Sequence, residues 1–373
     1  MIALKLGPEI MIDSTSRAGM TANCFTRCLF AIRGLVSGVT FLLFLAIPAL
    51  AHSREITDQI GRKLALPERI GRIYAAHPYT HVLAYVLAPE MLIGHLSIIG
   101  DEQKRFLRPE AAALPMLGGS PRGGPAVNME TVLAAKPDFV ILSGNARTEI
   151  SRATEKYVQV GLPVVFVNLE SIDDYPAAIE FFGRLVDRQA QARRLSDYAR
   201  KVLADVDRAV ASIPPGKRLR VYYAESTDGL ATECDQSYHA DAIKRAGGVI
   251  VHQCLLKTPM GMERVSFEQV MLYNPDVIVA SDPGFEAMAY ADPRWRSIKA
   301  VAEHRILSAP RTPFNWIDRP PSIMRIIGVQ WLAARFYPGV YAIDLRRELR
   351  EFHQRYLGID PTPEDLNRWV GQR

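Results

Sequence analysis

The sequence contains the same helix–turn–strand pattern twice. Residues 128–142 read NMETVLAAKPDFVIL, and residues 266–280 read SFEQVMLYNPDVIVA. An offset of 138 residues aligns Glu130 with Glu268, and it also aligns the two Pro-Asp pairs. In each copy, proline ends a short amphipathic helix, aspartate suits the turn, and the apolar run suits a buried parallel strand. Two copies predict two lobes of similar architecture; the alternative is a chance likeness between unrelated units.

Further strand and helix patterns alternate along the chain. Apolar strands are predicted within residues 72–76, 92–94, 163–167, 220–224 and 249–251. Strands that alternate with helices are typical of α/β lobes with mostly parallel sheets. A chain of 373 residues is long enough for two such lobes. We therefore predict an α/β fold with an N-terminal lobe over 52–175 and a C-terminal lobe over 214–373.

One long helix is predicted between the lobes, over residues 176–213. Its apolar positions, such as Ile179, Phe182 and Leu185, recur at spacings of three or four. Pro214-Pro215-Gly216 ends the pattern. A single helix of this length is expected to be a rigid connector that limits the motion of one lobe against the other.

The first 51 residues have the three parts of a signal peptide. Arg27 and Arg33 precede an uncharged apolar run over 34–51, which ends with the small residues of Ala49-Leu50-Ala51. Cleavage after Ala51 would leave a soluble periplasmic protein; an uncleaved N-terminal anchor is the alternative. Met20 would make a more typical start for such a peptide. No cysteine stands at the cleavage point, which argues against a lipid anchor.

The mature protein has one possible cysteine pair. Cys24 and Cys28 fall in the signal peptide, which leaves Cys234 and Cys254. In an oxidising compartment these two are expected to form a disulfide. The alternative is a pair of buried free thiols. The spacing is not C-x-x-C, so zinc or thioredoxin-like chemistry is poorly supported.

Composition and the missing motifs exclude other classes of function. The formal net charge is only +5, and no run of Lys and Arg interleaved with aromatic residues occurs, so nucleic acid is not an expected partner. The sequence has no G-x-S-x-G and no H-E-x-x-H. A binding protein is therefore favoured over an enzyme, with an exported metal-dependent hydrolase as the alternative.

Several stretches in order resemble a known family. They are Ile56–Arg62 with Leu66-Pro67 and Arg69-Ile70, His81–Leu87 before Leu92-Ile93-Gly94, Asn128–Leu142, Gly161–Val165 and Pro293–Val301. Together they resemble the periplasmic substrate-binding proteins of ABC importers for ferric siderophores, haem, cobalamin and related metal chelates. The resemblance implies two lobes bridged by a long helix, a ligand held between them, and no intrinsic cofactor. A metal would enter only as part of the ligand, and the protein is expected to be a monomer.

The resemblance also implies a partner, an ABC permease with its ATPase. One surface acid on each lobe would dock onto basic residues of the permease, and the matching positions are Glu130 and Glu268. The alternative role of these acids is to place negative charge at a helix N-terminus. A metal chaperone that uses the same fold without transport is a further alternative.

Candidate ligand-binding residues follow from the rule that ligands bind at the carboxyl ends of parallel strands. That rule selects loops with polar and aromatic side chains, namely those of His77, Tyr79, Asn145, Tyr223, Tyr238, His239, Arg311, Asn315, Trp316 and Arg319. Arg122, in the Gly-rich stretch 118–124, is a further candidate contact for an anion. Arginine forks bind carboxylates and oxyanions with two bonds, and an indole face offers stacking area. For the loop over 310–321, the alternative is a surface position in which Asp318 and Arg319 form a solvated pair of charges.

His77 and His81 are four residues apart, a spacing compatible with metal ligation on one helix face. Polar surface histidines are the alternative. Converging histidines would favour nickel–histidine as the ligand, whereas arginines would favour a ferric siderophore or an oxyanion. The expected ligand is thus a metal chelate of the iron–siderophore type. The alternatives are nickel–histidine, molybdate or tungstate, cobalamin and haem.

Overall fold

The computed structural model describes residues 53–119, 127–144, 154–254 and 261–371. Ser53–Arg373 forms one compact unit. The predicted signal peptide, Arg122 and Asn145 lie outside the described residues. Among the described residues, no helix combines the length and the apolar character needed to cross a bilayer.

The N-terminal lobe contains a hairpin and a parallel sheet in the order β3-β4-β5. The hairpin is formed by antiparallel β1 and β2. The described elements of this lobe are β1 (Ser53–Thr57), β2 (Lys63–Pro67), β3 (Ile73–Ala75), α2 (Pro78–Leu87), η1 (Pro89–Met91), α3 (Asp101–Lys104), α4 (Pro109–Ala112), α5 (Met129–Ala134), β4 (Phe139–Ser143), β5 (Val164–Val167) and η2 (Ile172–Asp174). The strand predicted at 92–94 is reduced to a bridge between Leu92 and Ile73.

The C-terminal lobe contains a second parallel sheet, in the order β11-β10-β6-β8, and a short antiparallel pair of β7 and β9. Its described elements are η3 (Pro215–Lys217), β6 (Arg220–Ala224), β7 (Ala231–Thr232), η4 (Tyr238–Ala240), α9 (Asp241–Arg245), β8 (Val249–Ile250), β9 (Glu263–Arg264), α10 (Phe267–Tyr273), β10 (Val277–Ala280), α11 (Phe285–Ala291), η5 (Trp295–Ser297), α12 (Lys299–Ala302) and β11 (Ile306–Ser308).

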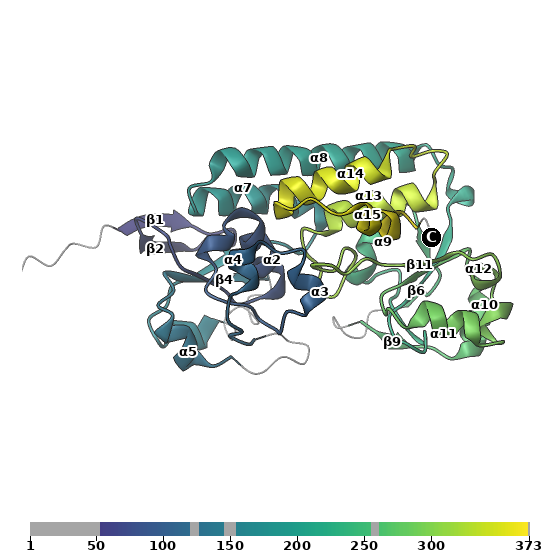
Figure 1. The fold of residues 1–373 in the computed structure, drawn as a ribbon, viewed down its shortest axis with the longest axis horizontal. Coiled ribbons are helices and arrows are strands. Elements are labelled where there is room, and N and C mark those ends of the chain that lie inside the picture. The colour runs from purple at the N-terminus through teal and green to yellow at the C-terminus, as the bar shows by residue number, and fades with distance from the viewer. Residues whose placement is uncertain (1–52, 120–126, 145–153, 255–260, 372–373) are drawn as a thin grey trace, which may run out of the picture. The chain divides into compact units, whose positions relative to one another are not determined.

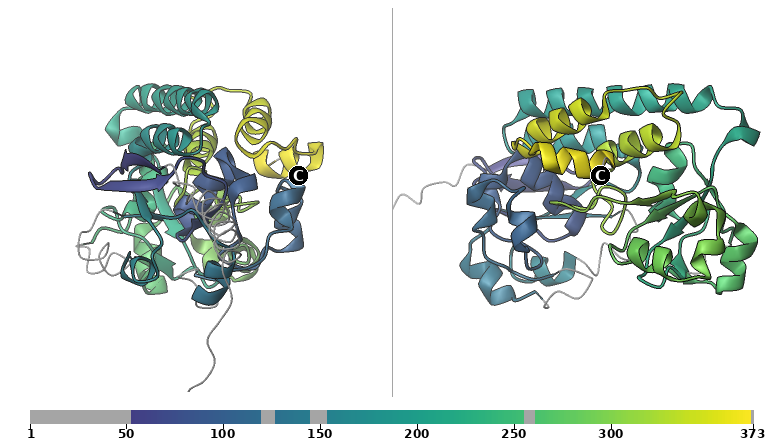
Figure 2. Two further views of the ribbon diagram at one scale, coloured as in Figure 1. Left: turned by 90° about the vertical axis from the view of Figure 1, so that its left-hand side faces the viewer. Right: turned by 45° about the vertical axis from the view of Figure 1, so that its right-hand side comes forward.

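A layer of helices runs along both lobes (Figure 1). It consists of α7 (Tyr175–Leu185), α8 (Gln189–Ala211), α13 (Arg325–Phe336), α14 (Leu345–Phe352), the π-helix η6 (His353–Leu357) and α15 (Pro363–Val370). The view in Figure 2 shows the same layer lying across both lobes. The chain is thus mixed α/β with two parallel sheets, as predicted.

The segment predicted as one helix over 176–213 forms two, which corrects that prediction. The chain turns at Asp187, whose φ is +55°, and α7 then packs against α8. Gly183 makes this contact possible, because a Cβ there would stand 2.2 Å from the Cβ of Ala192. The long connector is therefore α8 alone.

Successive residues of each strand alternate between two hydrophobic cores, and this alternation joins the sheets to the layers on both of their faces. In β6, Val221 and Tyr223 belong to the large core shared with the helical layer, whereas Tyr222 and Ala224 belong to a separate core on the other face. The strands of the N-terminal lobe divide in the same way. Since successive side chains of a strand point to opposite faces, an apolar run can fill both cores at once.

The repeated Pro-Asp turn has the same structural task in both lobes. Asp138 Oδ2 accepts a hydrogen bond from the backbone N–H of Arg72 at 2.8 Å. Asp276 Oδ2 accepts one from the backbone N–H of Arg220 at 2.9 Å. Each aspartate thus ties the start of one strand to the start of its neighbour, so the sequence repeat reflects a repeated unit of structure.

The motif at 57–62 fastens the hairpin to the sheet. Asp58 is buried and accepts bonds from Arg62 Nε at 3.0 Å and Nη2 at 2.8 Å. Arg62 Nη2 also donates to the carbonyl of Val164 at 2.6 Å, and its guanidinium lies over the ring of Phe166. The Asp and Arg of this motif therefore stabilise the fold.

Candidate ligand-binding site

Tyr79 of the N-terminal lobe and Tyr238 of the C-terminal lobe are in contact with each other. Tyr79 lies in the first turn of α2, directly after β3, and Tyr238 begins η4 in the C-terminal lobe. Burial raises the pKa of Tyr79, and a side-chain hydrogen bond with Tyr238 contributes to the same shift. Two neutral phenols therefore meet between the lobes, where the carboxyl ends of parallel strands are expected to bind a ligand.

His77 is the N-cap of α2. Its Nδ1 accepts a bond from the backbone N–H of Tyr79 at 3.4 Å, and the two rings pack edge to face. Burial lowers the pKa of His77 to about 4, so the ring is neutral at pH 7. Because Nδ1 accepts, we infer that Nε2 carries the proton. His77 is therefore available as a neutral N–H donor beside the helix N-terminus.

His81 belongs to the core and does not join His77. Its Nε2 lies 3.1 Å from Nδ1 of His95, whose Nε2 lies 2.7 Å from the carbonyl of Ala111. Since that carbonyl can only accept, His95 donates to it and accepts from His81. Burial lowers the pKa of His81 to about 3. The hypothesis of a metal held by His77 and His81 is corrected accordingly: the second ring is already used in packing.

The loop over 310–321 packs its aromatic residues against the helical layer and against the N-terminal lobe. Trp316 is fully buried, and its ring centroid lies 5.5 Å from that of His353 and 5.2 Å from that of Trp369. Phe314 packs edge to face against Tyr85 of α2. Trp316 is therefore a core residue, which corrects the expectation that its indole face would stack on a ligand.

Asn315 and Tyr223 are also turned away from solvent. Asn315 Oδ1 accepts bonds from the backbone N–H groups of Ile317 and Asp318, at 2.9 and 3.1 Å. It therefore shapes the loop. Tyr223 is fully buried in the core beneath the helical layer, and burial raises its pKa. Both side chains are thus buried, and their role in ligand binding stays a prediction.

Acid is expected to destabilise the protein because His81 and His353 are buried as neutral rings. Burial lowers the pKa of His81 to about 3 and that of His353 to about 4, whereas an unfolded imidazole titrates near 6.5. The unfolded chain therefore binds more protons in this range. The contribution of each neutral ring to the free energy of unfolding is complete above about pH 6.5 and is lost as the pH falls toward about 4. Between pH 7 and pH 5 the loss is roughly 2 kcal/mol per ring.

Urea unfolding at several pH values measures this loss. His353→Gln is the informative variant, because it removes one of the titrating rings and should reduce the slope of unfolding free energy against pH by about one proton. A variant with the slope of the wild type would show that His353 is not held neutral.

Arg319 is enclosed by carboxylates. Its Nε and Nη2 contact Glu225, with Nη2 3.0 Å from Oε2, and Nη2 also contacts Glu233. The Arg319 side chain is 6% exposed, and both carboxylates are fully buried. A guanidinium that already binds two carboxylates has little capacity left for an anionic ligand. The prediction that Arg319 binds the ligand is corrected for this reason.

Asp318 extends this ionic cluster toward Tyr238. His239 Nδ1 lies 2.7 Å from Asp318, and Arg325 Nη2 donates to Asp318 Oδ1 at 3.1 Å. Arg325 also donates to the carbonyl of Tyr238 at 2.9 Å. The predicted ligand-binding residue His239 thus pairs with Asp318. Arg325 fixes the backbone at Tyr238 through its hydrogen bond to the carbonyl.

The same cluster contains a geometry that resembles a metal site. In the described part of the chain, ligand atoms of Glu233, His239 and Asp318 lie within 4.8 Å of one another. Arg319 contacts Glu233, however, and its Nε lies 3.5 Å from Asp318 Oδ2. Arg319 and Arg325 therefore supply two positive charges to the carboxylates of Glu225, Glu233 and Asp318, and ion pairing within the chain accounts for most of the charge in this cluster.

Of the two predicted arginines that the structure describes, Arg311 is the accessible one. It follows β11 and is exposed, and its Nη1 donates to the carbonyl of Ser281 at 3.4 Å. Ser281 directly follows β10. Arg311 therefore presents a guanidinium at the carboxyl edge of the C-terminal sheet.

A disulfide links Cys234 and Cys254, with the two Cα atoms 5.6 Å apart. Glu233, next to the first cysteine, also accepts a bond from the backbone N–H of Met262 at 2.9 Å. The bridge therefore stabilises the segment that carries one carboxylate partner of Arg319. Sequence reasoning assigned no role to Glu225, Glu233 or Arg325. Glu225 lies in a loop that the strand-end rule selects, whereas the other two have no local sequence signal.

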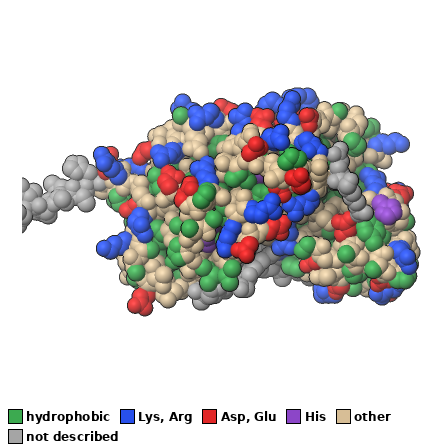
Figure 3. Space-filling model, in the orientation of Figure 1, with side chains coloured by type: hydrophobic (Ala, Val, Ile, Leu, Met, Phe, Trp, Pro, Cys, Tyr) green, Lys and Arg blue, Asp and Glu red, His purple; other side chains and the backbone are tan. Residues whose placement is uncertain are grey.

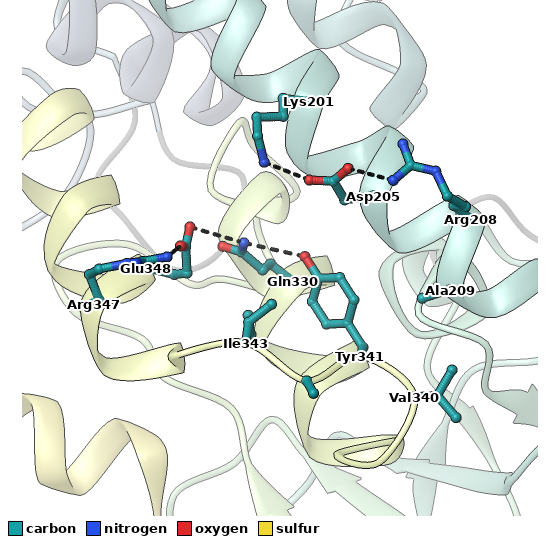
Figure 4. A pocket seen from close by; sticks show the side chains of 11 residues that line it. Lys201, Asp205, Arg208, Ala209, Gln330, Val340, Tyr341, Ile343, Arg347 and Glu348 are labelled. Carbon is teal, nitrogen blue, oxygen red and sulfur yellow. Dashed lines mark hydrogen bonds and ion pairs between the residues drawn. The ribbon is translucent and has the colours of Figure 1, made fainter.

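A pocket of about 440 Å³ lies elsewhere, between α8 and the helices that follow α13 (Figure 4). Its charged residues are paired with each other: Lys201 lies 2.6 Å from Asp205, and Arg347 lies 2.9 Å from Glu348. Figure 3 shows acidic and basic side chains side by side over this helical layer. The pocket is remote from the facing sheet edges, and paired charges favour a solvated groove over a ligand site.

Comparisons with known proteins match this architecture. A family model described as periplasmic binding protein matches residues 87–313. The molybdate-binding protein MolA of Haemophilus influenzae is 26% identical over 355 residues, which cover 87% of this chain and 96% of the relative.

Two solved structures are similar over almost their whole length. A solute-binding protein of an ABC transporter from Sulfurospirillum deleyianum is 34% identical, with 85% of this chain and 99% of that chain covered and a TM-score of 0.79. The Haemophilus influenzae protein MolA bound to molybdate is 25% identical, with 83% and 99% covered and a TM-score of 0.68.

Proposed function

The chain belongs to the periplasmic binding protein family, and from that premise we propose that it binds a small oxyanion between its two lobes, with molybdate as the first candidate. The family membership itself makes the protein a solute-binding component of ABC import. It is a binding protein and not an enzyme, and it has no intrinsic cofactor, because its ligand is the transported solute.

The observation that carries the proposal is the kind of group available at the facing sheet edges. Arg311 offers a guanidinium, and His77 offers an N–H beside the N-terminus of α2. The hydroxyls of Tyr79 and Tyr238 meet between the lobes. These groups donate hydrogen bonds, and a helix N-terminus attracts negative charge. Hydrogen-bond donors and a cation are the groups that the oxygens of a tetrahedral oxyanion require.

A small oxyanion accounts for these groups better than the iron–siderophore type of ligand. The indole of Trp316 and the guanidinium of Arg319 would have supplied stacking area and charge to a large aromatic chelate, and both are buried within the protein. A relative similar over nearly its full length is named as molybdate-binding, which supports the smaller ligand.

Calorimetric titration of the purified protein tests the proposal. Molybdate and tungstate are expected to bind, with sulfate as the competing oxyanion and ferric chelates, nickel–histidine, haem and cobalamin as the rival ligands. Binding of a rival without binding of molybdate would refute the oxyanion assignment.

Arg311→Ala is expected to weaken molybdate binding by about 1.5–3 kcal/mol, the range for hydrogen bonds to charged groups. Arg296→Ala is the matched control, since Arg296 is also exposed in the same lobe but lies in η5. Its affinity should equal that of the wild type. An unchanged affinity of Arg311→Ala would remove this arginine from the site.

We also propose export through the segment 1–51 and docking onto the permease through Glu130 and Glu268. Both acids are exposed, one in the first turn of α5 and the other in the first turn of α10. Each lobe thus offers one carboxylate to a basic partner, as the family resemblance implies.

A further inference from the structure

The two helices that carry these acids begin in the same way. Asn128 caps α5, and its Oδ1 accepts a bond from the backbone N–H of Thr131 at 3.2 Å. Ser266 caps α10, and its Oγ accepts a bond from the backbone N–H of Gln269 at 3.2 Å. Because the two capping bonds join equivalent positions, aligned residues of α5 and α10 lie at the same position relative to the N-cap.

The buried face of both helices is marked by a valine. Val132 and Val270 are both fully buried, each in the outer core of its own lobe. The 138-residue offset aligns them. With the N-cap and the buried face matched, the solvent-facing residues of α5 and α10 can be compared position by position.

The exposed face repeats an apolar residue as well as the acid. Leu133 is 38% exposed and Met271 is 50% exposed, and the same offset aligns them. Leu272, which follows Met271, is 78% exposed. Residues three apart on a helix are neighbours, so Glu130 lies beside Leu133 and Glu268 lies beside Met271. Each lobe therefore presents a carboxylate next to an apolar side chain.

The repetition distinguishes this pattern from ordinary surface chemistry. Single exposed apolar residues are common and need no explanation. Here an acid and an apolar residue recur together, at the same helix positions, in both lobes (α5 and α10 in Figure 1). A surface that occurs twice fits a partner that offers two equivalent complementary sites.

We propose that Leu133 and Met271, together with the acids beside them, form two matching docking patches for the permease of the importer. Each copy of the complementary surface on the permease would pair a basic side chain with an apolar one. Burial of the apolar residues would contribute to affinity, whereas the acids would contribute orientation and rate of association. This inference rests on the proposed docking role and not on the identity of the ligand.

Binding of the unliganded protein to the permease–ATPase complex of its own importer, held in nanodiscs, tests the inference. The double variant Leu133→Ser/Met271→Ser is expected to raise Kd on the order of tenfold, as for side chains at the centre of an interface. Its dependence on salt should equal that of the wild type, because apolar burial is not screened. Val340→Ser is the matched control, since Val340 is 48% exposed in the segment between α13 and α14.

An unchanged Kd for the double variant would overturn the inference, and so would a wild-type protein that does not bind the complex. The single variants Leu133→Ser and Met271→Ser should each produce part of the effect, and an effect confined to one lobe would refute two matching patches. Molybdate titration of the same proteins separates the two proposals. Intact permease binding without molybdate binding would refute the ligand and support the docking patches.

Discussion

Replacement of Arg325 by Met is expected to lower the free energy of unfolding by about 3–5 kcal/mol, the cost of removing one partner of a buried ion pair. Arg325 is fully buried and donates to Asp318 Oδ1 at 3.1 Å. It also donates to the carbonyls of Ile317 at 2.8 Å and Tyr238 at 2.9 Å. Methionine fills the space of the side chain but leaves the carboxylate and both carbonyls without these donors.

Equilibrium unfolding in urea measures this effect. Arg296→Met is the control for loss of an exposed arginine, and it is expected to lie within about 0.5 kcal/mol of the wild type. The double variant Arg325→Met/Asp318→Asn should recover part of the loss, because it removes the buried charge as well. A loss below about 1 kcal/mol for Arg325→Met would mean that Asp318 is not stabilised by this pair.

Reversal of both docking charges, Glu130→Lys with Glu268→Lys, is expected to lower solute uptake on the order of a hundredfold, since like charges brought together at an interface cost several kcal/mol. Both side chains are exposed, so the folded structure should tolerate lysine. Each single variant should transport at an intermediate rate. Uptake of radiolabelled solute by cells that lack the chromosomal copy is the measurement, and ligand affinity in vitro should remain near that of the wild type.

Glu364 provides a matched control for these variants. It is also exposed, and it also stands at the second position of a helix, α15, behind the capping residue Thr362. Glu364→Lys should therefore suffer the same loss of a favourable helix charge. If Glu364→Lys reduced uptake as strongly as the double variant, the effect would reflect the helix N-terminus and not the permease.

The helix–strand order was readable from sequence because it depends on local patterns. The run Val221–Ala224 predicts a strand buried on both faces, and the structure places its residues alternately in two cores. The Pro-Asp repeat was likewise visible, and Asp138 and Asp276 have the same role in both lobes. The break at Asp187 was not visible, because helical periodicity continues on both sides of a single left-handed residue.

The candidate site was readable only in part. The strand-end rule selected the loops of His77, Tyr79 and Arg311, and these side chains lie at the facing edges of the sheets. The same rule selected Trp316 and Arg319, which are enclosed by other parts of the chain. A rule that selects loops identifies which backbone segments reach the edge, but it does not state which side chains in them face solvent.

The sequence by itself determined the two similar lobes and the acid repeated on each of them, because helix periodicity, strand alternation and turn residues act over a few neighbouring positions. Only the tertiary structure decided which charges are available to a ligand. Glu225 and Glu233 stand 94 and 86 residues away from Arg319, yet they bind its guanidinium, whereas Arg311 stays exposed. Electrostatic pairing depends on distance in space, and the folded chain brings together residues that no local pattern connects.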